Sequence, residues 1–152
     1  MLVKTKHFGD IDLDDSKILT FDDGILGFEN CRKYTILYNN ENGSRPAISW
    51  LQSLDVKELA LPIINPLLAK PDYNPMLEDE LLKPLGTLND DNLMIFLSLT
   101  IPADITKMTT NLKAPFIINT DTKKGAQVIV ENQDYLIKYP VYEIFKSKEQ
   151  EA

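Results

Sequence analysis

The side chains with catalytic potential in this chain are few. His7 is the only histidine, so a serine or cysteine triad would have to take its general base from the start of the chain. The sequence also lacks a GxSxG nucleophile elbow, a Walker lysine loop, an HExxH zinc pair and an Asp-rich calcium loop. We therefore predict no catalytic, metal-binding or cofactor-binding residues, and a protein that is not an enzyme.

Paired carboxylates offer the remaining acid-base chemistry. Asp14 and Asp15 are adjacent, and Glu78 and Glu80 are two residues apart. General acid-base catalysis needs an apolar pocket that raises the pKa of one carboxyl group, and the sequence around these pairs indicates none. Both pairs are interpreted as solvated surface charge.

Residues 24–27, Gly-Ile-Leu-Gly, have the spacing of the GxxG loop that binds RNA in KH domains. That loop relies on basic side chains, whereas Asp22, Asp23 and Glu29 flank this one. We therefore reject nucleic-acid binding here. The two glycines are expected to adopt turn conformations that other residues disfavour, with Phe28 in the core.

Composition narrows the class of protein further. The chain has 152 residues, the size of one domain, and a formal net charge of −7, which opposes close approach to a phosphate backbone. Cys31 is the only cysteine and is expected to be a small buried side chain, which suits a reducing cytoplasm. We see neither a signal peptide nor an apolar run long enough to span a membrane. A basic protein is the most suitable partner for so acidic a chain.

A protein-binding surface is predicted in a proline-stiffened connection. Tyr73 lies between Pro71 and Pro75, and its ring either fills the core or forms an exposed anchor. Trp50 lies in an alternating strand and is expected in the core. The predicted contact residues for a basic partner are Asp72, Tyr73, Glu78, Asp79 and Glu80.

These residues must be positioned by short strands, because alternation of apolar and polar residues dominates both ends of the chain. Residues 8–13 predict an opening hairpin, residues 39–43 a polar loop, and residues 93–101 a buried central strand. A second hairpin is predicted from residues 114–119 and 126–130 around a turn at 121–125. Further strands are expected at residues 18–21, 34–38, 47–51 and 135–142, the last an edge strand interrupted by Pro140.

The middle of the chain is less regular. Proline at 62, 66, 71, 75 and 84 argues against a long helix or a central strand at those points. Residues 76–82 predict a short helix whose apolar face holds Leu77, Leu81 and Leu82, and a helical turn is plausible at residues 88–91. Residues 1–145 are predicted to form one domain, and the polar residues 146–152 a flexible tail.

Several motifs, taken in order, resemble the flagellar assembly factor family FliW. They are spread over nearly the whole chain, and their common order is more specific than any one of them. The family commonly has proline where this chain has Leu26, and residues 69–85 match least well. The motifs are the Gly9-Asp10 turn, residues 24–28, 48–54 and 59–66, Pro71-Asp72-Tyr73, residues 111–115, Asn119, residues 125–127 and Tyr135.

The resemblance implies a function without a cofactor. Members of this family bind the flagellin subunit and, when flagellin is scarce, bind the translational repressor CsrA and keep it off the flagellin message. The alternative is a dedicated flagellin chaperone that has no regulatory role. We expect a mainly antiparallel all-β domain, barrel-like or built from two sheets, with one or two short helices, located in the cytoplasm.

Overall fold

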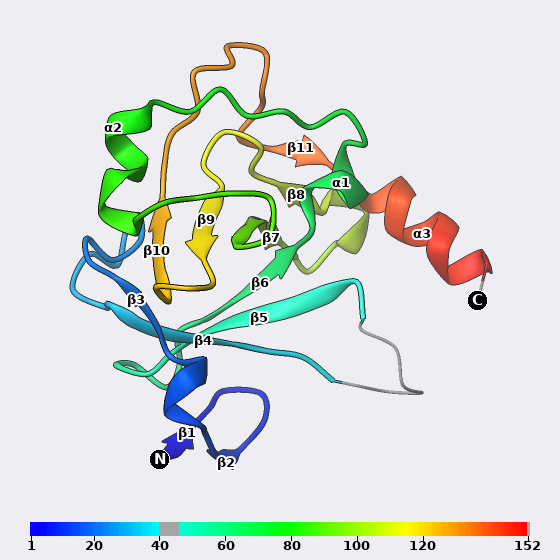
Figure 1. Cartoon of the computed structure of the whole chain (residues 1–152). Coiled ribbons are helices and arrows are strands. Elements are labelled where there is room, and N and C mark those ends of the chain that lie inside the picture. The colour runs from blue at the N-terminus through cyan, green and yellow to red at the C-terminus, as the bar shows by residue number, and fades with distance from the viewer. Residues whose placement is uncertain (40–45, 152) are drawn as a thin grey trace.

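The computed structural model describes residues 1–39 and 46–151, with side chains described through residue 146. Figure 1 shows the arrangement of its elements. The strands are β1 (Leu2–Lys4), β2 (Asp10–Asp12), β3 (Leu19–Phe21), β4 (Lys33–Leu37), β5 (Ile48–Ser53), β6 (Ala60–Ile64), β7 (Leu93–Thr100), β8 (Thr109–Thr110), β9 (Phe116–Asn119), β10 (Lys124–Gln127) and β11 (Tyr139–Pro140). The helices are α1 (Pro66–Ala69), α2 (Asp79–Leu82) and α3 (Tyr142–Glu151), with single 3-10 turns at Asp15–Lys17 (η1), Lys83–Leu85 (η3) and Ile105–Lys107 (η4).

Seven of the described strands close into a barrel. Their order is β7-β6-β5-β4-β3-β10-β9, and β9 pairs again with β7. All neighbours in this ring are antiparallel except β3 and β10, which run parallel. Closure leaves these strands few free edges, which protects a small sheet from pairing with other chains. The predicted all-β, mainly antiparallel class is confirmed.

Aromatic side chains fill the barrel. The ring of Phe21 meets Tyr34 edge-on with centroids 5.3 Å apart, and meets Phe116 at 6.3 Å. Gly125 allows this packing, because a Cβ atom there would lie 2.6 Å from the Phe21 ring. In a second apolar cluster, Leu97, Leu99 and Val141 pack with the rings of Tyr73 and Tyr135.

The Tyr34 hydroxyl is a weak point of this core. Its side chain is fully buried, and its oxygen has no hydrogen-bond partner among the described residues. Burial raises the pKa of Tyr34 well above its usual range, with a smaller contribution from Cys31. The hydroxyl group therefore bears a desolvation cost that no contact offsets.

Replacing Tyr34 with phenylalanine is expected to leave stability unchanged or to raise it by about 1 kcal/mol, because the mutation removes an unsatisfied polar group and keeps the ring. Urea unfolding monitored by circular dichroism measures the difference. Tyr73→Phe is the control, because the Tyr73 hydroxyl donates a 2.9 Å hydrogen bond to the Leu112 carbonyl and its loss is expected to destabilise the protein. Equal destabilisation by both variants would contradict the interpretation of Tyr34.

The local strand predictions hold with shifted ends. The opening hairpin exists, but its strands are β1 and β2, because the Thr5 hydroxyl donates to the Gly9 carbonyl, accepts from the Phe8 amide and so closes a turn over residues 5–9. The second hairpin is β9 and β10, and its second strand begins at Lys124. Strand β7 pairs with β6, β8 and β9, as expected for a central strand. Most of the predicted 39–43 loop lies outside the described residues.

Proline did not exclude a strand at Pro62. This residue lies inside β6 and pairs with Trp50 of β5, whereas β6 pairs with β7 through Ile63 and Ile64. Pro62 therefore lies where β6 has a neighbouring strand on one side only, a position that tolerates a missing hydrogen-bond donor.

Trp50, expected in the core, is only partly buried. Its ring packs against His7 with centroids 4.0 Å apart.

Other expectations need correction. Residues 135–142 form only the two-residue β11 before α3 begins. The turn expected at residues 88–91 is present but shifted to residues 90–92, where the Leu93 amide donates to the Asn89 carbonyl at 3.1 Å and the Asn89 and Asn92 side chains accept from backbone amides. Leu81 of α2 is 42% exposed, so the short helix does not bury the whole predicted face. Phe28 is 44% exposed and is not a core residue. Helix α3 runs to Glu151, and the single domain at 1–145 with a flexible tail at 146–152 stays a prediction.

Among the described residues, none of the helices combines the length and apolar character needed to cross a bilayer.

Candidate protein-binding surfaces

The predicted contact residues lie in the connection between α1 and β7, which crosses the outside of the barrel (Figure 1). Asp72, Glu78, Asp79 and Glu80 are all exposed, and we call these four the acidic segment. Asp79 and Glu80 form the first turn of α2, where negative charge interacts favourably with the helix dipole. The structure thus brings the predicted acids to the surface within one connection.

Tyr73 differs from the acids beside it. Its ring is buried and stacks on Tyr135 with centroids 5.0 Å apart, and its hydroxyl donates to the Leu112 carbonyl at 2.9 Å. Burial, followed by the nearby Tyr135, raises the pKa of Tyr73 well above its usual range. Of the two positions that the sequence left open for the Tyr73 ring, the structure has the buried one. Tyr73 therefore packs beneath the acidic segment and is not an exposed anchor.

Backbone hydrogen bonds hold the acidic segment in place. Asn132 accepts from the Met76 amide at 2.6 Å and donates to the Asn74 carbonyl at 3.0 Å. The Tyr135 hydroxyl accepts from the Asn74 amide at 2.7 Å, and the Glu131 amide donates to the Met76 carbonyl at 2.9 Å. These contacts fix the connection against residues 131–135 before any partner arrives, which lowers the ordering cost of binding.

The four acids carry unequal free charge. Lys70, which is partly buried, approaches the exposed Asp72 at 3.1 Å, and Lys83 approaches Glu80 at 2.7 Å in an exposed ion pair of small energetic value. The Lys70 hydrogen bond lowers the pKa of Asp72. Within the described residues, Glu78 and Asp79 form no salt bridge. The uncompensated negative charge of this surface is therefore concentrated at Glu78 and Asp79.

A further acid lies beside Glu78. The carboxyl groups of Glu78 and Glu131 share a hydrogen bond, and that bond, together with the negative charge of Glu131, raises the pKa of Glu78 above its ordinary value of 4.5. These two residues are far apart in the chain, and no local pattern pairs them. Glu131 joins the acidic segment only through tertiary structure.

The carboxyl pair predicts a pH dependence of stability. The folded protein holds a proton on Glu78 to higher pH than the unfolded chain, so this stabilising contribution is complete below pH 4.5 and is lost as the pH rises through the folded-state pKa. Glu131→Gln removes the like charge and should make the unfolding free energy decline less across that window. Urea unfolding at several pH values measures the slope, with the exposed Glu58→Gln as the control. An unchanged slope in Glu131→Gln would refute the coupling.

An apolar groove is the second candidate surface. It has a volume of about 790 Å³ and lies between the end of β6 with α1 on one side and the first half of β7 on the other. Leu67 and Leu93, 56% and 37% exposed, are among its lining residues. Its remaining described lining is Pro46, Ala47, Ser49, Ile63, Ile64, Asn65, Pro66, Leu68, Tyr73, Pro75, Met94, Ile95 and Phe96.

Strand pairing and a helix cap create this groove. The recorded pairing of β6 with β7 ends at Ile64, and residues 93–96 of β7 pair with β9. Asn65 then accepts a hydrogen bond from the Leu67 amide at 2.9 Å, and Pro66 takes the first helical position, so the chain turns into α1. Sequence reasoning missed the groove, although Asn65-Pro66 is a helix-start signal that predicts α1.

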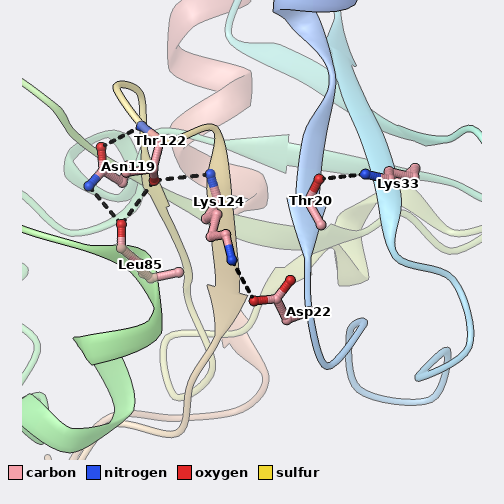
Figure 2. A network of polar contacts seen from close by, with 7 residues as sticks. All are labelled: Thr20, Asp22, Lys33, Leu85, Asn119, Thr122 and Lys124. Carbon is pink, nitrogen blue, oxygen red and sulfur yellow. Dashed lines mark hydrogen bonds and ion pairs between the residues drawn. The ribbon is translucent and has the colours of Figure 1, made fainter.

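Polar contacts also fix the far end of the same connection. The buried Asn119 side chain donates to the Leu85 carbonyl at 2.8 Å and accepts from the amides of Asp121 and Thr122 at 2.9 and 3.2 Å. Figure 2 shows the contacts of Asn119 with Leu85 and Thr122 beside the Lys124–Asp22 ion pair, which is 3.0 Å long. The residues between α2 and β7 are thereby tied to the β9–β10 hairpin.

The described residues contain no group of three or more histidine, cysteine, aspartate or glutamate side chains suited to a metal ion. Cys31 is buried, as expected. The two described surfaces of interest are therefore an acidic segment and an apolar groove, both of which suit macromolecular contact.

Comparison with known proteins gives a consistent result. A family model described as FliW protein matches residues 2–141. The chain is 59% identical to the flagellar assembly factor FliW of Lachnoclostridium phytofermentans over 97% of this chain and 95% of that protein. It is 49% identical to the protein of the same name from Lachnospira eligens, over 98% and 99%. A crystal structure of the flagellar assembly factor FliW superposes with a TM-score of 0.84 at 28% identity, covering 93% of this chain and 96% of that one.

Proposed function

This chain belongs to the FliW family, and we infer that it is a flagellar assembly factor. In finer detail, we propose that it binds flagellin and antagonises the translational repressor CsrA by protein binding, relieving repression of flagellin synthesis. The function requires no catalytic step and no cofactor. Its place of action is the cytoplasm, where translation is regulated.

The acidic segment is the observation that carries the regulatory part of this proposal. The resemblance to FliW implies that CsrA is a basic RNA-binding protein. The exposed carboxylates of Glu78 and Asp79 then attract CsrA and repel RNA. An acidic protein docked on the repressor can oppose RNA binding without covering the RNA site, if it favours a conformation that binds RNA weakly.

The apolar groove supports the flagellin part. An amphipathic helix binds by placing its apolar face in a groove of this kind, and the terminal helices of flagellin are amphipathic in the family's system. The exposed leucines Leu67 and Leu93 give such a helix an apolar contact. We propose that flagellin occupies the groove, and that newly made flagellin captures this protein and frees the repressor.

Titration of the protein into CsrA bound to a labelled flagellin leader RNA tests the proposal. We expect the RNA complex to dissociate, and added flagellin subunits to restore it. Tight flagellin binding with no effect on the RNA complex would refute the regulatory role and favour the alternative of a dedicated flagellin chaperone. Absence of binding to both proteins by calorimetry would refute both.

Charge reversal tests the acidic segment. The double variant Glu78→Lys, Asp79→Lys is expected to weaken CsrA binding about tenfold at physiological salt, mainly by slowing association, because it replaces attraction with repulsion. Asp10→Lys, Glu58→Lys changes the net charge equally and alters exposed residues outside the acidic segment, so it is the matched control. Surface plasmon resonance separates the two rates. Equal weakening by both double variants would place the effect in the net charge and not in this segment.

A further inference from the structure

The turn that follows β3 presents apolar side chains to solvent in a fixed conformation. Gly24 and Gly27 have φ values of +67° and +88°, and the Phe28 amide donates to the Ile25 carbonyl at 2.8 Å. The Leu26 amide donates to the side chain of Gln127 at 2.8 Å. The backbone of residues 24–28, which we call the glycine turn, is thus tied to itself and to β10.

The exposed side chains of the glycine turn are large and apolar. Leu26 is 53% exposed and Phe28 44%, in a segment whose glycines adopt conformations that most residues disfavour. A segment whose backbone is already ordered has less entropy to lose on binding, and aromatic residues are frequent hot spots of interfaces. The prediction that Phe28 fills the core is wrong, so its exposure to solvent needs a different explanation.

Residues 127–131 connect this turn with the acidic segment. The amides of Val128 and Val130 donate to the Pro115 and Lys113 carbonyls, and both side chains are buried. Ile129 between them is 53% exposed, and Glu131 is exposed after them. Gln127 contacts Leu26, and Glu131 contacts Glu78. The four residues of extended chain from Gln127 to Glu131 span roughly 13 Å, so this segment links the two contacts.

The resulting surface combines exposed apolar residues with exposed acids. Leu26, Phe28 and Ile129 are its exposed apolar residues: Leu26 and Phe28 belong to the glycine turn, and Ile129 is two residues beyond Gln127, which contacts Leu26. Glu131 follows Ile129 and contacts Glu78, and Asp22, Asp23 and Glu29 are exposed in the chain beside the glycine turn. Lys124 partly neutralises Asp22 through their 3.0 Å ion pair. Figure 1 shows the turn after β3 and helix α2 on the same side of the molecule.

We propose that this surface is where the basic repressor docks, with Phe28 and Leu26 as the apolar anchors and the flanking acids meeting lysine or arginine side chains. The inference rests on the proposed function and adds the site to it. The exposed acids beside the apolar residues favour a basic partner here, whereas the apolar groove at α1 suits an amphipathic helix. The two partners then bind different parts of the molecule.

Truncation of the exposed apolar side chains tests the assignment. The expected increase in the dissociation constant for cognate CsrA, measured by calorimetry, is about thirtyfold for Phe28→Ala and about tenfold for Leu26→Ser or Ile129→Ser. The affinity for flagellin should not change. Ile137→Ser, at a residue that is 63% exposed outside this surface, is the matched control and should bind both partners as the unaltered protein does.

Thermal unfolding of each variant shows whether it is folded, and Leu26→Ser keeps the test valid if Phe28→Ala is unstable. Unchanged CsrA affinity in folded variants, with tight binding by the unaltered protein, overturns the docking site and leaves the proposed function standing. An unaltered protein that does not bind CsrA refutes the regulatory function itself. Loss of flagellin affinity equal to the loss of CsrA affinity overturns the assignment of this surface to the repressor.

Discussion

Alanine in place of Asn119 is expected to lower the free energy of unfolding by about 3 kcal/mol, because it breaks several buried hydrogen bonds at once. The Asn119 amide group donates to the carbonyls of Leu85 and Thr87 and accepts from the amides of Asp121 and Thr122. The alanine variant leaves those two amides without a side-chain acceptor, whereas Leu85 still accepts from the Thr122 hydroxyl. A loss of this size is a large part of the 5–15 kcal/mol that stabilises an ordinary domain.

Thermal unfolding should show a decrease in the midpoint of roughly 10 °C for Asn119→Ala, given about 2–4 °C per kcal/mol for a domain of this size. Asn30→Ala is the control, because Asn30 is exposed and the same truncation there should change stability by less than about 0.5 kcal/mol. Similar midpoints for the two variants would mean that the network in Figure 2 contributes little to stability.

Gly24→Ala should be at least as damaging. Its φ of +67° is unfavourable for alanine by about 1–2 kcal/mol, and a Cβ atom would lie 2.5 Å from the backbone oxygen of Glu29. The backbone of a tight turn cannot move away without breaking its own hydrogen bonds. Overpacking therefore adds about 1–3 kcal/mol to the loss of stability. We expect a total loss of about 3–4 kcal/mol in urea unfolding.

Gly9 offers a matched control for this effect. Its φ of +65° is nearly the same, but no atom lies within 4 Å of a Cβ built on it. Gly9→Ala should therefore lose only the conformational part, about 1–2 kcal/mol, and the difference between the two variants measures the close approach. Equal losses would show that the contact with Glu29 relaxes freely.

These predictions concern the supports of the proposed surfaces. Asn119 secures the end of the connection that carries the acidic segment, and Gly24 shapes the turn that presents Phe28. Residues on loops bind partners effectively when a rigid scaffold holds them in position. In this protein the closed barrel is that scaffold. Variants that loosen the supports should weaken partner binding in proportion to the folded population that they lose.

The sequence by itself determined the local features of this protein. Strand-type composition and alternation identified β4 and β5, and a continuous apolar run identified β7, because each of these signals is readable in one segment. The glycine pair at residues 24–27 predicted a turn, since positive φ at both positions selects glycine. The ordered motifs indicated the family, which the comparisons confirm.

Only the tertiary structure decided how these elements meet. Pairing of β7 with β9 closes the barrel, and the end of the β6–β7 pairing opens the groove, but neither depends on a local pattern. The same holds for single side chains. Tyr73 is buried because Tyr135 and Leu112 cover it, and Phe28 is exposed because the rigid turn directs it outward. Burial depends on which distant residues arrive beside a side chain, and that information is absent from the segment that contains it.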